Sequence, residues 1–272
     1  MALFLESACD IAREAGALLA GYYHRGIPYE LKDKYDLVTE ADRASEALVV
    51  ERLSTLFPTH SILGEEGGQR QHSFEYQWYV DPLDGTTNFA HGYPMFNVTL
   101  ALERAGEVIC GVIYDPLRQE LFTAELGGGA YVNGKRIRAS QVEKLENALL
   151  STGFPSRKRH ENINVHFFHQ VAMGTHGVRR GGSAAIDLAY VACGRLDGFW
   201  EFGLNPWDMA AGLLLIREAG GSTTDMKGGA VSLRGRHIAV TNGLIHAELI
   251  ALFDEIFHGR HRYPMPEIQS PE

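Results

Sequence analysis

Two aspartates that lie three residues apart are the side chains of this sequence best suited to chemistry. They belong to residues 78–89, which read WYVDPLDGTTNF. The apolar residues before Asp81 predict a strand, and the turn-forming residues after it predict that Asp84 lies close to Asp81. Two carboxylates held that close repel each other, and a divalent cation between them would relieve the repulsion. Because Mg²⁺ prefers oxygen ligands, the Leu83 carbonyl is a third candidate donor.

The residues that follow this turn predict a site for an anion. Gly85 allows a ligand to approach the backbone closely, and Thr86 is expected to begin a helix with free N–H groups. Phosphate binds well to such groups because they carry partial positive charge. Metal ligands beside an anion site of this kind describe a centre for phosphoryl transfer.

Acidic residues at two other predicted strand ends strengthen this interpretation. DPLDG alone could equally be an ordinary turn, because Asp, Pro and Gly are common turn residues. However, Glu65 and Glu66 follow the apolar residues 61–64, and Asp208 follows another strand at the start of a helix. Three acid-bearing strand ends favour a metal site over three unrelated turns. Glu66 could support the metal or be a solvated charge.

Other phosphate-handling sites do not match the sequence. The glycine-rich lysine motif of a P-loop does not occur, and the two aspartates are not spaced as in phosphatases with an aspartate nucleophile. Cys9, Cys110 and Cys193 lack the loop of a cysteine phosphatase. The sequence therefore predicts direct attack by a water molecule that a metal ion activates.

Composition limits the environment and the partners. The 272 residues include 25 Lys and Arg against 34 Asp and Glu, a formal charge of −9, which gives no general attraction for nucleic acid or anionic membrane. Three widely spaced cysteines indicate a reducing compartment. Neither a signal peptide nor an apolar run long enough for a membrane span is found. We expect a soluble, cytoplasmic protein that binds neither membrane nor nucleic acid directly.

Hydrophobic periodicity predicts helices followed by an antiparallel sheet in the first half. Residues 3–22 and 44–56 have helical spacing, residues 32–36 resemble a loop, and Thr39 with Asp42 forms a capping box. Short turns between successive strands predict a meander. The expected strands are residues 61–64, 78–81, 96–102, 108–114, 120–124 and 130–132.

The second half alternates strands and helices, which predicts an α/β arrangement with crossovers. The expected strands are residues 149–152, 178–180, 196–201 and 238–241. The expected helices are residues 160–173, 184–192, 207–219 and 245–257. A glycine-rich and then polar segment, 127–146, is the best candidate boundary. We therefore expect residues 1–140 to carry most of the acids and residues 141–272 to form an α/β unit that carries Asp208.

Two long stretches, 78–89 and 207–221, identify a resemblance to a known family. In this order and spacing they resemble the inositol monophosphatase family of Mg²⁺-dependent, lithium-sensitive phosphatases, above all the bacterial inositol-1-monophosphatases. The resemblance runs from Asp36 to Gly221. It implies an α/β (α+β) fold, a layered α-β-α-β-α sandwich as in fructose-1,6-bisphosphatase. It also implies a homodimer.

The resemblance also implies a role for each matching residue. It implies two or three Mg²⁺ ions held by Glu65, Asp81, the Leu83 carbonyl, Asp84 and Asp208. It implies that the attacking water is oriented by Glu65, Thr86 and Asp42. It implies substrate contacts from Asp84, Gly85, Thr86, Gly182, Ser183, Ala184, Glu201 and Asp208.

Some residues keep two interpretations. Asp42 could cap a helix, support Thr86, or do both. Trp207 is better explained as a core anchor than as a ligand contact, and Arg179 and Arg180 as solvated charges rather than a phosphate site.

The substrate is expected to be a small phosphorylated polyol. Residues 91–98 and 180–185 are most similar to the inositol phosphatase branch, and a carboxylate at Glu201 could accept hydrogen bonds from neighbouring hydroxyls. Inositol 1-phosphate is therefore the first choice. Histidinol phosphate, fructose 1,6-bisphosphate and nucleotide phosphates are alternatives. A different class of function, binding to the transcription machinery, is a further alternative.

Overall fold

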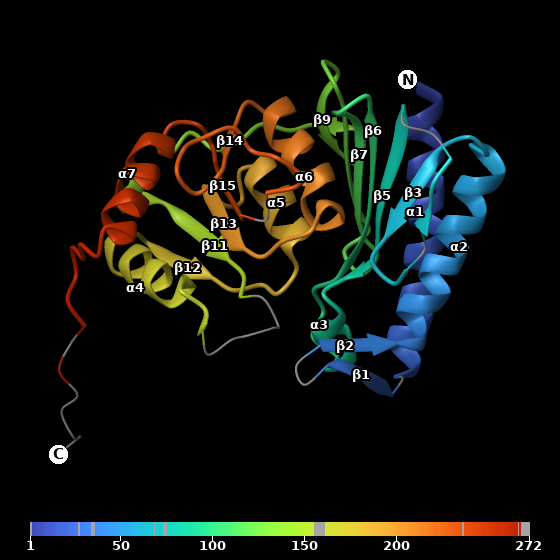
Figure 1. Ribbon diagram of the computed structural model, residues 1–272, viewed down its shortest axis with the longest axis horizontal. Helices are drawn as coiled ribbons and strands as arrows, with labels where there is room; N and C mark the ends of the chain where they lie inside the picture. Colours follow the sequence, from blue (N-terminus) through green and yellow to red (C-terminus); the bar gives the residue numbers. More distant parts are fainter. Residues whose placement is uncertain are drawn as a thin grey trace.

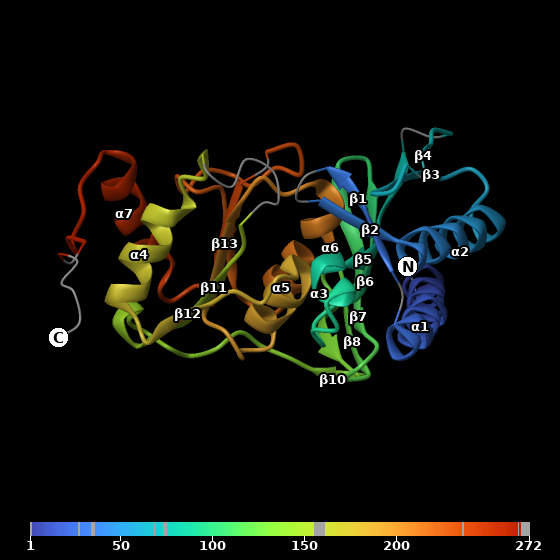
Figure 2. The ribbon, with the colours of Figure 1, turned by 90° about the horizontal axis from the view of Figure 1, so that it is seen from below.

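The chain folds into alternating layers of helix and sheet, seen edge-on in Figure 1 and again from below in Figure 2. This is the predicted α-β-α-β-α sandwich, so the expected fold class is confirmed. The computed structural model describes residues 2–26, 28–33, 36–67, 69–72, 75–154, 161–235, 237–265 and 267. No helix in these ranges is both long and apolar enough to cross a bilayer.

The larger sheet, which we call the large sheet, is built mainly as a meander. Its strand order is β10-β9-β8-β7-β6-β5-β3-β4, and β5 to β10 pair antiparallel in succession, as predicted. The left-handed Asn133 and Gly134 make the tight turn between β9 and β10. The strands are β3 Ser61–Gly64, β4 Gln69–Arg70, β5 Tyr76–Asp84, β6 Asn97–Arg104, β7 Glu107–Asp115, β8 Glu120–Glu125, β9 Gly129–Val132 and β10 Lys135–Arg136.

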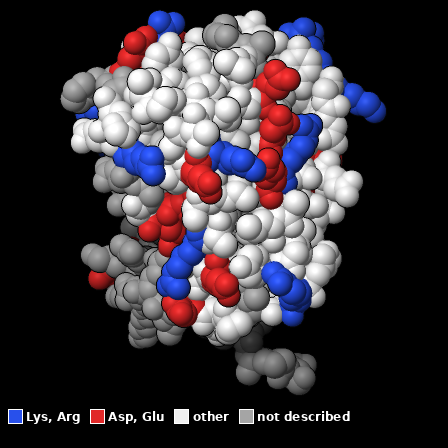
Figure 3. Space-filling model, turned by 90° about the vertical axis from the view of Figure 1, so that its right-hand side faces the viewer, with Lys and Arg blue, Asp and Glu red and all other residues white. Residues whose placement is uncertain are grey.

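Helices α1 (Ala2–Arg25) and α2 (Glu40–Leu56) cover the outer face of the large sheet. Apolar residues of α1 at helical spacing, such as Ile11, Ala15 and Leu19, are buried against Trp78 and other residues of the sheet. The opposite face of these helices is charged. Figure 3 shows basic and acidic side chains interspersed there, and Arg52 of α2 pairs with Glu14 of α1.

The prediction of a loop at residues 32–36 was wrong in part. Strands β1 (Tyr29–Asp33) and β2 (Asp36–Thr39) pair as an antiparallel hairpin, while residues 34 and 35 lie outside the described residues. Backbone hydrogen bonds pair the two strands. The charged residues within 32–36 resemble those of a loop, which explains the wrong prediction.

Helices α5 (Ala184–Ala192) and α6 (Pro206–Glu218) form the layer between the two sheets. Small residues allow α6 to lie close to the large sheet. A Cβ placed on Gly111 of β7 would come within 2.9 Å of the Ala211 Cα of α6. Because Asp208 is in the first turn of α6, this close packing sets how far that carboxylate lies from the sheet.

The second sheet, which we call the small sheet, has the order β12-β11-β13-β15-β14. Strand β11 is parallel to β12 and β13, as crossovers predict, whereas β15 pairs antiparallel with β13 and β14. Helices α4 and α7 cover its outer face. The elements are η1 Leu145–Asn147, β11 Leu149–Thr152, α4 Asn164–Gly174, β12 Gly177–Arg179, β13 Gly198–Phe202, β14 Ser222–Thr224, β15 His237–Thr241 and α7 His246–Phe257.

The connection between the sheets runs from β10 to β11. The predicted division after residue 140 falls within this connection. That residues 1–140 and 141–272 are separate units stays a prediction.

Candidate active site

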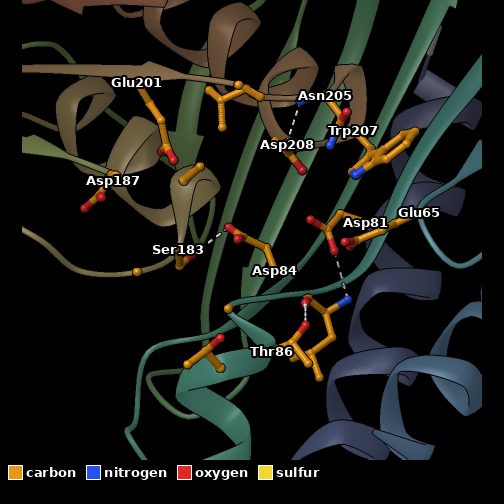
Figure 4. Close-up of a pocket in the computed structure, with 18 of the residues that line it drawn as sticks. Glu65, Asp81, Asp84, Thr86, Ser183, Asp187, Glu201, Asn205, Trp207 and Asp208 are labelled. Carbon is orange, nitrogen blue, oxygen red and sulfur yellow. Dashed lines mark hydrogen bonds between the residues drawn. The ribbon is translucent and has the colours of Figure 1, made fainter. Parts of the chain in front are cut away.

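A cavity of about 690 Å³ opens where the two sheets face each other, and elements of both halves of the chain line it. Figure 4 shows its acidic side chains converging from different elements. Asp84 ends β5, Glu201 lies on β13, and Asp208 lies in the first turn of α6. Glu65 directly follows β3, and Ser183 is the N-cap of α5.

Nearly every residue that the sequence singled out lines this cavity. Asp42 does not, because it is fully buried behind Thr86. Glu66, for which two interpretations were open, is also in the cavity wall. The predicted residues in the wall are Glu65, Asp81, Leu83, Asp84, Gly85, Thr86, Gly182, Ser183, Ala184, Glu201 and Asp208.

A bulge in β5 brings the two motif aspartates to the same cavity. Strand β5 does not end at Asp81, as predicted, but continues to Asp84 with a register shift between them. Asp81 pairs with Thr99 and Asp84 with Asn97, so β5 has one residue more than β6 over this span. In a regular strand, side chains three residues apart face opposite sides. The extra residue lets both carboxylates face the cavity.

Asp42 combines the two roles that the sequence left open. Its Oδ2 accepts a hydrogen bond from the Thr39 N–H at 2.7 Å, which completes the predicted capping box of α2. Its Oδ1 accepts one from the Thr86 hydroxyl at 2.9 Å. The Thr86 hydroxyl also lies 3.1 Å from the Leu83 carbonyl oxygen. The start of α2 thereby fixes the orientation of a hydroxyl in the cavity.

The other carboxylates are each anchored by the backbone near them. Asp81 Oδ1 accepts the Leu83 N–H at 3.1 Å, and Asp208 Oδ2 accepts the Asn205 N–H at 2.6 Å. Asp84 Oδ2 accepts the Ala185 N–H at the start of α5 at 2.8 Å. Each of these three carboxylates is therefore held in a fixed orientation, Asp81 and Asp84 on β5 and Asp208 on α6.

Burial and mutual repulsion make these carboxylates hold protons unusually tightly. Burial raises the pKa of Asp81 well above its usual range, and the charges of Glu65, Asp84 and Asp208 add to the rise. Burial raises the pKa of Asp208 to about 8 despite hydrogen bonds from Asn205, which oppose the rise. Carboxylates that are buried this close together would be stabilised in their charged form by a nearby cation.

Burial also raises the pKa of Glu201 to about 8, and the charges of Asp187 and Asp84 contribute. Arg180 opposes this rise. Among the described residues that line the cavity, Arg180 is the only lysine or arginine. The acids of the wall therefore greatly outnumber its basic side chains.

The donor atoms of the cavity fit a hard divalent cation. The described residues of the wall include no histidine or cysteine, so carboxylate and carbonyl oxygens are the available ligands. Within the described ranges, no three acidic, histidine or cysteine side chains are already arranged as a closed metal cage. Mg²⁺ does not require one, because it usually takes one or two carboxylates and completes its shell with water and phosphate.

The wall also presents an indole N–H to a polar ligand. Trp207 lies beside Glu65 and Asp81 (Figure 4), and its buried Nε1 has no hydrogen-bond partner within the described part of the chain. Buried N–H groups are almost always paired. Trp207 also packs against the core between the sheets, so it is both the predicted anchor and part of the cavity wall.

Sequence reasoning missed several residues of the site. Asp187 and Gly153 line the cavity but resembled ordinary helix and turn residues. A Cβ on Gly153 would overlap the Glu201 carboxylate, so a side chain there would displace Glu201. Arg180 lines the cavity, although the sequence favoured a solvated charge. Asn97 contacts Asp84, and although it lies in the segment 91–98, it was not singled out as a site residue.

Comparison with known proteins gives the same class of protein as the fold and the cavity. Residues 1–258 match the inositol monophosphatase family. Nus factor SuhB of Pseudomonas aeruginosa is 48% identical over 246 residues, 88% of this chain and 91% of that protein. Inositol-1-monophosphatase of Mesorhizobium japonicum is 46% identical over 229 residues, 83% of this chain and 86% of that protein.

Solved structures agree. The extragenic suppressor protein suhB of Bartonella henselae superimposes with a TM-score of 0.89 at 41% identity, covering 93% of this chain and 99% of that one. Inositol monophosphatase from Anabaena gives a TM-score of 0.84 at 45% identity, covering 92% and 94%. The chain belongs to the inositol monophosphatase family.

Proposed function

We propose that this chain is a Mg²⁺-dependent phosphatase that hydrolyses inositol 1-phosphate to inositol and phosphate. The observation that carries the proposal is the meeting of Glu65, Asp81, Asp84 and Asp208 in one cavity. Membership of the family and its relatives named inositol-1-monophosphatase support the choice of substrate.

The proposed metal ligands are Glu65, Asp81, the Leu83 carbonyl, Asp84 and Asp208, for two or three ions. Bound Mg²⁺ would lower the pKa of a water molecule and neutralise charge on the phosphate and the leaving oxygen. The Asp81 carboxylate, which is 2% exposed and lies in the same cavity wall as Glu65, Asp84 and Asp208, would be one of the ligands that hold the ions.

The attacking water is oriented, in this proposal, by Thr86 together with Glu65. Because the Thr86 hydroxyl donates toward Asp42 or Leu83, its oxygen keeps lone pairs that can accept a hydrogen bond from water. Asp42 is fully buried and holds that orientation. The Gly85 and Thr86 N–H groups, at the start of α3 (Thr86–Ala90), would bind the phosphate.

The other end of the cavity would bind the polyol. Glu201 is 9% exposed and can accept hydrogen bonds from hydroxyl groups, and Gly182, Ser183 and Ala184 lie in the same wall. A carboxylate here disfavours a second phosphate. We therefore rank fructose 1,6-bisphosphate below inositol 1-phosphate, with histidinol phosphate and nucleotide phosphates as the remaining alternatives.

Membership of the family supports proposals about the cellular location, the oligomeric state and the inhibition by lithium. We propose a cytoplasmic homodimer that lithium inhibits. The three cysteines are free, as a reducing compartment would require.

Relatives named Nus factor SuhB support a second candidate function, in which the chain binds the transcription machinery. Figure 3 shows no basic patch on the described part of the α1 and α2 face, so direct contact of that face with nucleic acid is not favoured.

Phosphate release from purified protein tests the proposal. Inositol 1-phosphate, histidinol phosphate and fructose 1,6-bisphosphate would each be supplied with Mg²⁺ and with a chelator. We expect Mg²⁺-dependent release and the highest kcat/KM for inositol 1-phosphate. A clear preference for histidinol phosphate would change the substrate. No release from any phosphomonoester, together with recovery of a stable protein complex, would favour the binding function.

A further inference from the structure

Asn97 is a buried amide that contacts the Asp84 carboxylate from inside the large sheet. It is the first residue of β6 and is fully buried. Its Nδ2 donates to Asp84 Oδ2 at 3.0 Å and to Ser183 Oγ at 2.8 Å. Its Oδ1 accepts the Thr99 hydroxyl at 2.6 Å. The bond from Thr99 fixes which end of the amide faces Asp84, so Asn97 presents donors to the carboxylate.

Ser183, at the start of α5, also contacts the Asp84 carboxylate. It is the N-cap of α5 and is 2% exposed. Its hydroxyl donates to Asp84 Oδ2 at 2.7 Å, a bond drawn in Figure 4. The Ala185 N–H donates to the same oxygen at 2.8 Å. Three donors from two layers of the fold therefore meet on one carboxylate oxygen.

This arrangement distinguishes the two oxygens of Asp84. A carboxylate oxygen has about two lone-pair sites, so three donors occupy the capacity of Oδ2. Oδ1 is the oxygen that keeps capacity for a cation. The donors also stabilise the charged form of Asp84, because each lowers its pKa against the rise that burial causes. An aspartate at position 97 would instead place a second negative charge against Asp84.

We propose that Asn97 and Ser183 are positioning residues that hold the Asp84 carboxylate through Oδ2 and so leave Oδ1 available to a divalent cation. The inference rests on the proposed function, in which Asp84 is a metal ligand. Partners that hold a metal ligand typically change metal affinity about 10–100-fold when they are removed. Neither residue was assigned this role from the sequence.

Direct measurement of Mg²⁺ binding tests the inference. Isothermal titration calorimetry would compare the full chain with Asn97→Leu, which removes both donors, and with Ser183→Ala, which removes one. We expect both to bind Mg²⁺ about tenfold more weakly or worse. Ser183→Thr, which keeps the hydroxyl, should retain the affinity. In Asn97→Leu the Mg²⁺ concentration for half activity should rise, while kcat at saturating Mg²⁺ changes much less.

Asn242→Leu is the matched control. Asn242 is 4% exposed and its side chain bonds Ser140, Val142, Leu244 and Ile245, none of which lines the cavity. This variant should lose stability but bind Mg²⁺ as the unaltered chain does. If Asn97→Leu does not fold, Ser183→Ala carries the test.

The outcomes separate the two proposals. If the unaltered chain binds Mg²⁺ and both folded variants bind it equally well, the positioning role is wrong and the proposed function stands. If the unaltered chain binds no Mg²⁺, the proposed metal site is wrong and the positioning role is wrong with it.

Discussion

Asp81 carries a buried negative charge that its described neighbours do not balance. Its carboxylate is almost completely buried, and Glu65, Asp84 and Asp208 all act on it as like charges. The Leu83 N–H donates a hydrogen bond to it, and no lysine or arginine is among the main influences on its pKa from the described residues. A buried charge without a partner lowers the stability of the folded state. The residue therefore favours function at the expense of the metal-free fold.

Asp81→Asn should separate these two effects. The amide removes the buried charge and can still accept from the Leu83 N–H, so the Tm measured in a chelator should rise, by roughly 2–4 °C for each kcal/mol relieved. Activity should fall by more than about a hundredfold, beyond the range typical of residues that only support a ligand. Differential scanning calorimetry and phosphate release would measure the two. A lower Tm with normal activity would show that Asp81 is a structural residue.

The raised pKa values of Glu201 and Asp208 predict how metal-free stability depends on pH. Each pKa rises from an ordinary value of 4.5 or 3.8 to about 8 in the folded chain. At pH values between the ordinary and the raised pKa of each group, the folded state binds more protons than the unfolded state. The free energy of unfolding therefore falls as pH rises. Chemical denaturation in a chelator should show this decline from about pH 5 to pH 8. Added Mg²⁺ should reduce it, and a stability that rises over this range would contradict the assignment.

At the scale of elements, the position of Asp208 depends on how closely α6 lies against β7. Gly111 is the residue of β7 that permits the approach, because a side chain there would meet the backbone of Ala211. Packed interiors rarely accept an added methyl group without shifts. A side chain added at Gly111 should therefore displace α6, and Asp208 in the cavity should move with that helix.

Gly111→Ala is expected to lower the free energy of unfolding by about 1–3 kcal/mol, the usual cost of overpacking. It should also reduce activity, since α6 and Asp208 must move away from the sheet. Gly21→Ala is the control, because a Cβ at this helical position meets no atom within 4 Å. That variant should be stabilised by about 0.5–1 kcal/mol with unchanged activity. Urea denaturation would measure both, and a neutral Gly111→Ala would contradict the packing argument.

Elements with a strong local pattern could be predicted from the sequence, and those without one could not. The helix at 184–192 was predicted with its observed ends, Ala184–Ala192, because its apolar residues are a local signal. The hairpin of β1 and β2 was missed because the charged residues within 32–36 resemble a loop. The bulge between Asp81 and Asp84 was missed because register is a property of the strand pair.

Site residues, like elements, could be predicted only where they carry a local sequence signal. Glu65, Asp81, Asp84 and Asp208 could be predicted because each lies at or near the end of a predicted strand or the start of a predicted helix. Asn97 could not, since its partner Ser183 is 86 positions away in the sequence. Asp187 resembled any residue in the first turn of a helix, and only the fold shows that it lines the cavity.

At the scale of the whole molecule, the cavity exists because two sheets and the helices between them meet there. Glu65, Asp81 and Asp84 come from the side of the large sheet, while Asp208 and Glu201 come from the second half of the chain. A cation shared by Asp84 and Asp208 would therefore join the two halves. Any ligand that binds only this folded arrangement stabilises it by mass action.

The location of bound cations tests the central claim most directly. Crystals grown with Mn²⁺, which accepts similar oxygen ligands, would give anomalous scattering that marks each ion. The account predicts peaks in the cavity within ligand distance of Asp81, with Asp84 and Asp208 or Glu65 on their other sides. Peaks only at surface carboxylates, with the cavity acids unligated in a well-ordered map, would contradict it.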